Sequence, residues 1–174
     1  MKRVLIAGIG NVFFGDDGFG VEVVRRVDAR MLPSHIAAVD YGIRGVHLAY
    51  DLLDGDVDVL IMVDALPTDD PPGTLTLLEL DEAAHAELTA GPTAVDSHAM
   101  NPQAVIAALH TLGGRMGRIF VVGCTPQSVE PGIGLSPAVA AAVEPALGMA
   151  IDTATRFAPL LAEEGGARAR TGTV

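Results

Sequence analysis

Residues 4–20, VLIAGIGNVFFGDDGFG, decide the fold of this chain. The apolar run at residues 4–7 predicts a fully buried β-strand, and the glycine-rich turn at residues 8–11 follows it directly. The acidic pair Asp16 and Asp17 comes next, just before a helix that we expect to begin near Gly18. Ligands of open parallel α/β sheets bind at the carboxyl ends of the strands, so this acidic turn is a candidate functional site.

A dinucleotide-binding turn is the first alternative for this stretch. That fingerprint needs a third glycine, which lets the helix pack closely on the strand. Gly8 and Gly10 fit the first two positions, but Phe13 occupies the third. The two acids would also repel a pyrophosphate at the start of the helix, where anions normally bind. The pattern therefore argues against a nucleotide cofactor.

Composition indicates a single globular domain. The chain has 174 residues, of which 49% are hydrophobic, and this is enough for one sizeable core. No apolar run approaches the roughly 20 residues that cross a bilayer, and we identify no signal peptide, so we expect a cytoplasmic protein without a membrane partner. A net charge of −11 would be repelled by phosphate backbones, which excludes a nucleic-acid role. The lone Cys124 excludes an intramolecular disulfide, and we expect it to be a buried thiol.

The first half of the chain alternates between strands and helices. A helix before Pro33 leads to a short strand at residues 36–39, and a helix over residues 46–53 leads to a long apolar strand at 57–63. This order requires right-handed crossovers and a parallel core. We expect the first strand to lie between the second and the third, so that a crevice opens at their carboxyl ends.

The second half completes the sheet. Residues 74–80 alternate in polarity after a short connection, which predicts an edge strand antiparallel to the third strand. The remaining expected elements are helices over residues 81–88 and 101–112, a last strand at 118–123, and a final helix from Ser136 that Pro145 should kink.

The fold class predicted by these patterns is α/β. We expect one three-layer domain over residues 1–162, with a mostly parallel twisted sheet of about five strands, helices on both faces and one antiparallel edge strand. Residues 163–174 are small and charged, which predicts a disordered tail.

Three side chains form the candidate site: Asp17 after the first strand, Asp64 at the end of the third, and His98 in a loop. Two neighbouring carboxylates repel each other unless a cation or a shared proton compensates. Imidazole with carboxylates suits borderline divalent ions such as nickel or zinc. Simpler readings stay open, in which Asp16 or Asp17 caps the helix and His98 is a surface residue.

Several segments together resemble the hydrogenase maturation proteases, the endopeptidases that process the large subunit of nickel–iron hydrogenases. The matching segments are GIGN at residues 8–11, DDGFG at 16–20, VDA at 63–65, SH at 97–98, and the run from GCTP at 123–126 through EP at 130–131 to GLSP at 134–137. The similarity spans residues 3–150, and the order and spacing of the segments make it specific.

The resemblance implies a cytoplasmic protease that removes a C-terminal extension from the nickel-loaded large-subunit precursor. The substrate supplies the nickel. The metal-contacting acids of the family fall on Asp17 and Asp64 and its histidine on His98, which are therefore also the candidate catalytic residues. Many members have glutamate at the first of these positions, so Asp17 is one methylene shorter. Ala99 follows the histidine, where glutamine is common.

Two mechanisms are compatible with this assignment. In one, Asp17, Asp64 and His98 bind the nickel, which polarises the scissile carbonyl or a water. In the other, nickel is only a recognition handle and one carboxylate is the general base. A function of a different class stays open, namely a non-catalytic nickel-binding or delivery module in hydrogenase assembly.

The turn after the second strand is a candidate substrate-binding segment because it borders the same edge of the sheet. Its residues are Gly42, Ile43, Arg44 and Gly45. No heptad pattern or apolar exposed helix demands a partner copy, so we expect a monomer.

Overall fold

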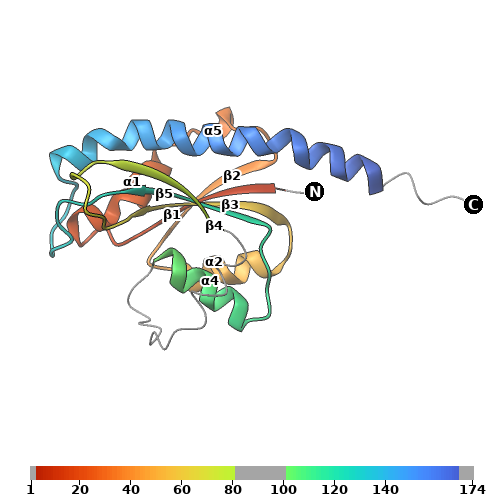
Figure 1. Cartoon of the computed structure of the whole chain (residues 1–174), viewed down its shortest axis with the longest axis horizontal. Coiled ribbons are helices and arrows are strands. Elements are labelled where there is room, and N and C mark those ends of the chain that lie inside the picture. Colours follow the sequence, from red (N-terminus) through yellow and green to blue (C-terminus); the bar gives the residue numbers. More distant parts are fainter. Residues whose placement is uncertain (1–2, 81–100, 169–174) are drawn as a thin grey trace, which may run out of the picture.

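The computed structural model describes residues 3–80 and 101–168, which fold around a five-stranded sheet (Figure 1). The strands are β1 (Arg3–Ile9), β2 (Ile36–Gly42), β3 (Val57–Ala65), β4 (Leu75–Leu80) and β5 (Arg118–Cys124), and their order in the sheet is β2-β1-β3-β5-β4. Strand β1 pairs in parallel with both β2 and β3, and β3 pairs in parallel with β5. The predicted parallel core is confirmed, with β1 between β2 and β3.

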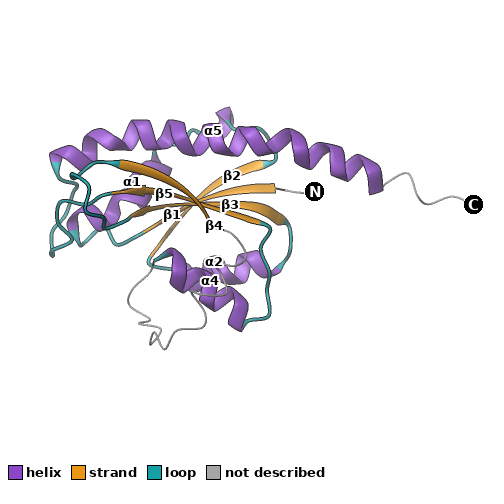
Figure 2. Cartoon of the chain, viewed as in Figure 1, coloured by secondary structure: helices purple, strands orange, loops and turns teal. Residues whose placement is uncertain are grey.

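Helices cover both faces of the sheet, as Figure 2 shows. Helices α1 (Phe19–Arg25) and α5 (Pro137–Arg168) pack on one face, and α2 (Gly45–Leu53) and α4 (Pro102–Thr111) pack on the other. Two short 3-10 helices, η1 (Gly15–Gly18) and η2 (Ala29–Met31), lie before and after α1. The expected three-layer α/β architecture is therefore confirmed. None of the helices in the described part of the chain is long and apolar enough to cross a membrane.

The central strands are apolar on both faces because each face carries its own core. In β1, Val4 and Ile6 point into the core under α1 and α5, whereas Leu5 and Ala7 point into the core under α2 and α4. Successive side chains of a strand point to opposite faces, so a strand covered on both sides reads as a continuous hydrophobic run. The apolar run at residues 4–7 is therefore explained by the two cores that β1 separates.

The edge strand has a different partner from the one we expected. Strand β4 is antiparallel, but it pairs with β5 and not with β3. Strand β5 is buried from Ile119 onward and lies inside the sheet, with β3 on one side and β4 on the other. Strand β4 is the edge of the sheet and exposes Leu77, Leu78 and Glu79, of which the charged Glu79 opposes pairing with a further strand.

The last helix is longer than we expected. Helix α5 runs without interruption through Pro145 to Arg168, so residues 163–168 extend the helix rather than begin a tail. Pro145 leaves the carbonyl of Ala141 without its usual donor, and both residues are exposed, so water can hydrate that group. The helix expected over residues 81–88 and the tail from residue 169 lie outside the described residues.

Two glycines let α1 begin directly on the carboxyl ends of β1 and β3. A Cβ atom on Gly20 would overlap the carbonyl oxygens of Val63 and Ile9, and a Cβ atom on Gly8 would overlap the carbonyl oxygen of Gly20. Glycine inside such elements marks a close approach of backbones. This contact places residues 10–18 over the ends of two adjacent strands.

Gly20→Ala is therefore expected to lower the melting temperature. Forcing a methyl group between packed backbones costs about 1–3 kcal/mol or more, and each kcal/mol corresponds to about 2–4 °C in a protein of this size. The matched control is Gly148→Ala, because Gly148 is exposed in α5 and its Cβ position has nothing within 4 Å. Thermal unfolding followed by circular dichroism should show the control melting at or above the wild-type temperature. Equal melting of the two variants would mean that the close approach is wrong.

Candidate active site

Asp64 is a buried acid at the carboxyl end of β3. Asp64 is only 3% exposed, and its Oδ1 accepts a hydrogen bond of 2.8 Å from the backbone N–H of Ala65. Burial first, and the negative charge of Asp17 second, raise the pKa of Asp64 well above its ordinary value. A carboxylate in this position gains from any cation that compensates its charge.

Asp17 lies in η1 and is half-buried. Its Oδ2 accepts a hydrogen bond of 2.7 Å from the backbone N–H of Asn11, which closes the turn after β1. Burial raises the pKa of Asp17 despite this hydrogen bond. The residue before α1 is Gly18, and no side chain caps that helix. The capping role that we left open for Asp17 is therefore wrong.

In space, Gly10 lies between the backbone of Asp17 and the side chain of Asp64. Its φ is +126°, and a Cβ atom there would overlap the carbonyl oxygen of Asp17 and lie 3.8 Å from Oδ1 of Asp64. The turn therefore passes directly over the Asp64 carboxylate, and the Asp17 segment rests on the turn. Asp17 and Asp64 share one corner of the sheet, where the carboxyl ends of β1 and β3 meet.

The donor set of this corner suits a divalent cation in part. Two carboxylates supply oxygen ligands and a local excess of negative charge. Among residues 3–80 and 101–168, however, no group of three or more histidine, cysteine, aspartate and glutamate side chains could hold a metal ion. His98, the expected third contact, falls outside the described residues and stays a prediction.

Asp16 has a different role from its neighbour and from the capping role that we expected. Asp16 is 1% exposed, and its carboxylate accepts four hydrogen bonds from a loop more than 100 positions away in the sequence. Oδ2 accepts from the N–H groups of Gln127 (2.8 Å) and Ser128 (3.1 Å) and from the Ser136 hydroxyl (2.9 Å), and Oδ1 accepts from the Ser136 N–H (2.6 Å). Burial acts to raise the pKa of Asp16, but these hydrogen bonds outweigh it and lower that pKa.

Asp16 therefore anchors the loop at residues 125–136 against η1. Backbone hydrogen bonds reinforce the contact, from Gly15 to Gly132 (2.9 Å), from Asp16 to Ser128 (3.1 Å) and from Gly132 to Phe13 (2.9 Å). Sequence reasoning missed this link because no local pattern connects the two segments. The available signal was the second acid itself, since one acid is enough to cap a helix.

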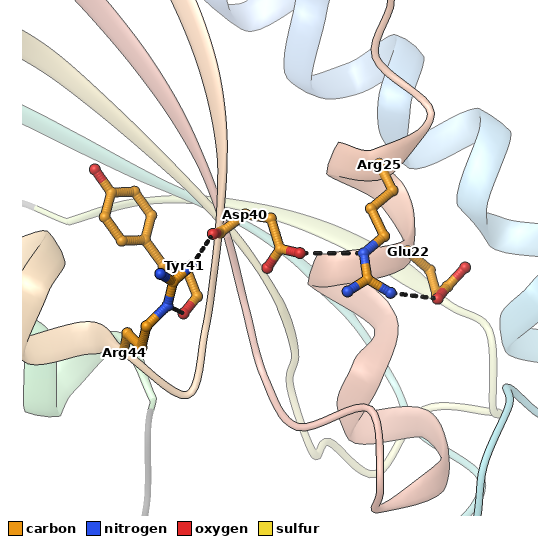
Figure 3. Close-up of polar contacts among 5 residues, drawn as sticks. All are labelled: Glu22, Arg25, Asp40, Tyr41 and Arg44. Carbon is orange, nitrogen blue, oxygen red and sulfur yellow. Dashed lines mark hydrogen bonds and ion pairs between the residues drawn. The ribbon is translucent and has the colours of Figure 1, made fainter.

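The turn after β2 lies beside the same corner. The backbone N–H of Gly10 donates to the carbonyl oxygen of Gly42 at 3.1 Å, and Gly42 has a φ of +53°. Asp40, two residues before the end of β2, holds the strand and the turn together, because its Oδ2 accepts a hydrogen bond from Arg25 Nε at 3.1 Å and its carbonyl oxygen accepts one from Arg44 at 2.8 Å (Figure 3). Gly42, the first of the four predicted substrate-binding residues, is thus held next to Gly10. The other three follow it directly in the sequence, and of these Ile43 is exposed.

Cys124 is a buried free thiol, as expected. Burial, followed by the charge of Asp16, raises the pKa of Cys124 to about 11. A thiol with such a pKa is protonated at neutral pH, and this argues against a role as the nucleophile.

Comparisons with known proteins identify the family and agree with the fold. Residues 21–153 match the profile described as hydrogenase maturation protease. The hydrogenase 2 maturation protease of Escherichia coli is 35% identical over 147 residues, which cover 83% of this chain and 86% of that protein. The structure of the hydrogenase maturating endopeptidase HybD from E. coli aligns with a TM-score of 0.67 at 31% identity, over 87% of this chain and 91% of the other. A hydrogenase 2 maturation peptidase from Thaumarchaeota archaeon SCGC_AB-539-E09 aligns with a TM-score of 0.65 at 30% identity, over 87% and 97%.

Proposed function

We infer that this chain, which belongs to the hydrogenase maturation protease family and is a peptidase, removes a C-terminal extension from the nickel-loaded precursor of a nickel–iron hydrogenase large subunit. The observation that carries this proposal is the pair of carboxylates at one corner of the sheet, where Asp64 is buried and has Asp17 as its charged neighbour. Such a pair favours a bound cation, and in this proposal the cation is the nickel of the substrate.

The residues of the chain then have distinct tasks. Asp17 and Asp64 contact the nickel, with His98 as the third contact, and so hold the precursor with its scissile peptide at the carboxyl edge of the sheet. Hydrolysis adds water to the peptide carbonyl, breaks the C–N bond and passes a proton to the departing amine. The nickel polarises the carbonyl or the water, or one carboxylate takes the proton of the water as a general base.

Intact mass measurement tests this function directly. A large-subunit precursor is incubated with the protein, once loaded with nickel and once without nickel. We expect the loaded precursor alone to lose a C-terminal peptide. Cleavage of both forms would contradict the role of nickel in recognition. Retention of the extension in both forms would favour the nickel-delivery alternative.

The turn after β2 gives a second prediction. Gly42→Val should slow processing by about tenfold or more, because small displacements at a site are costly for catalysis. A β-branched residue is strained at the positive φ of Gly42, and relief of that strain moves the carbonyl that binds Gly10.

The matched control for this substitution is Gly55→Val. Gly55 has a φ of +70° and open space around its Cβ position. It lies just before β3, at the amino ends of the strands and away from the candidate active site. Both variants carry comparable backbone strain, so both should lose some thermal stability. Only Gly42→Val should lower the initial rate of precursor processing, and equal rates in the two variants would remove this turn from the substrate site.

A further inference from the structure

A groove of about 350 Å³ begins at the segment that carries Asp17. Its first wall is formed by residues before and within α1, and its second wall by the segment that leads into α5. The lining residues are Val12, Gly15, Gly18, Glu22, Arg25 and Arg26 on the first wall, and Ile133, Gly134, Leu135 and Ala140 on the second. Gly15 and Gly18 flank the acidic pair, so the groove adjoins the candidate active site.

Exposed apolar side chains lie on the two segments that form the walls of the groove, and one of them, Ile133, lines it. We call Phe13, Phe14, Val129 and Ile133 the apolar rim. Ile133 is 86% exposed and Phe13 is 64% exposed. A β-bridge between Phe14 and Gly132 joins the two segments that carry the rim. Hydrogen bonds to Asp16 hold the same two segments together, so the backbone that carries the apolar rim is held in place.

The charged side chains of the groove already have partners. Arg25 pairs with Glu22 at 3.6 Å and with Asp40 at 3.1 Å, and Arg26 pairs with Glu144 at 2.8 Å. The groove therefore presents mainly apolar and glycine surface to an occupant, which favours an uncharged, apolar one.

The ion pair of Arg25 and Asp40 links the first wall of the groove to strand β2 (Figure 3). Gly15 and Gly18, which line the groove, are the first and last residues of η1, the short helix that carries Asp17. A polypeptide that occupies the groove would therefore contact η1, in which Asp17 lies.

We propose that this groove and the apolar rim bind an apolar segment of the large-subunit precursor, close to the bond that is cleaved. The inference rests on the proposed function, because it takes the protein substrate of that function as the occupant. A peptidase holds its substrate on both sides of the scissile bond, and buried aromatic and aliphatic anchors provide most of the affinity of such contacts. Gly134 in the second wall has nothing within 4 Å of its Cβ position, so a peptide backbone can approach closely there.

Ile133→Asp tests the proposal. The charge is placed on a side chain that is almost fully in water, so folding should be unaffected, but it would be buried unpaired under the precursor. We expect the affinity for the nickel-loaded precursor, measured by biolayer interferometry, to fall by about fivefold or more. KM for processing should rise to a similar extent, whereas kcat should stay near the wild-type value. The matched control is Met31→Asp, which is 80% exposed in η2, near the amino end of β2, and should change neither quantity.

Each outcome has a definite meaning. Equal precursor affinity for wild type, Ile133→Asp and Met31→Asp overturns the proposal, as does an absence of binding by the wild type. Weaker binding by Ile133→Asp without any cleavage by the wild type would support the groove and overturn the protease function. Sedimentation of the wild type as a dimer that Ile133→Asp dissociates, with unchanged precursor binding, would assign the apolar rim to a second copy of the chain and overturn the proposal.

Discussion

Asp64→Asn is expected to abolish processing of the precursor and to raise the melting temperature of the protein. Asparagine has nearly the same shape and its Oδ1 still accepts the hydrogen bond from Ala65, but it removes the charge that the proposed function needs. Loss of a group that contacts the metal or transfers the proton should reduce the rate by about 100-fold or more. The rate is measured from the intact mass of the nickel-loaded precursor over time.

The gain in stability follows from the raised pKa of Asp64. The folded protein binds this proton more tightly than the unfolded chain, whose carboxyl has its ordinary pKa of 3.8. Stability therefore falls as the pH rises from 3.8 through the raised pKa, and it stays low above that range. Asp64→Asn removes this loss, so the difference in melting temperature should be largest at neutral pH and should vanish in acid.

The control for both effects is Asp54→Asn, because Asp54 is an exposed acid at the end of α2. It should leave both the rate of processing and the melting temperature at neutral pH near the wild-type values. An Asp64→Asn protein that still processes the precursor at the wild-type rate would contradict both mechanisms considered above. Lower stability of that variant at neutral pH would contradict the assignment of a raised pKa.

Asp16→Ala is expected to cause the largest loss of stability among these substitutions. Three backbone N–H groups and one hydroxyl lose their acceptor together. Donors left without a partner in a buried site cost about 1–3 kcal/mol each, and water can reach some of these, so we expect a total of about 3 kcal/mol or more. Urea unfolding measures the loss, and hydrogen exchange should show lost protection at the amides of residues 127, 128 and 136.

The same acid should make the protein sensitive to low pH. The pKa of Asp16 is lower in the folded state than its ordinary value of 3.8, so its contribution is complete above 3.8 and is lost as the pH falls through the lowered pKa. Asp16→Ala should lack this component of acid unfolding. Asp28→Ala is the control for hydrogen exchange, since the Asp28 carboxylate also accepts several hydrogen bonds, but only from the nearby and exposed Arg30, and its loss should leave the three amides protected. Unchanged exchange at the three amides in Asp16→Ala would contradict the role of Asp16.

The sequence predicts the features that depend on local pattern and on general rules of parallel sheets. Val4–Ala7 reads as a buried strand because both of its faces carry a core. The approach of Asp17 to Asp64 follows from two adjacent strands whose carboxyl ends meet. The structure adds the reason for Gly8 and Gly20, which is a contact between backbones that no motif displays.

Other features depend on contacts between distant segments. The partner of β4 is decided by where β5 enters the sheet, and a polarity pattern contains no information on that. Asp16 binds groups 111–120 positions away. Proline removes one helix hydrogen bond, and this costs free energy. Helix α5 nevertheless continues through Pro145 because neighbouring side chains such as Val143 and Ala146 are buried in the core under the helix. Local propensity predicts an interruption there, and tertiary packing outweighs it.

The central claim is that Asp17 and Asp64 act as one unit on the nickel-loaded precursor. The most direct test is a single-turnover rate of extension removal for Asp17→Asn, Asp64→Asn and the double variant, with the enzyme in excess. Groups that act together are not additive, so the double variant should be no slower than the slower single variant. Losses that multiply in the double variant, or a wild-type rate in either single variant, would contradict the claim.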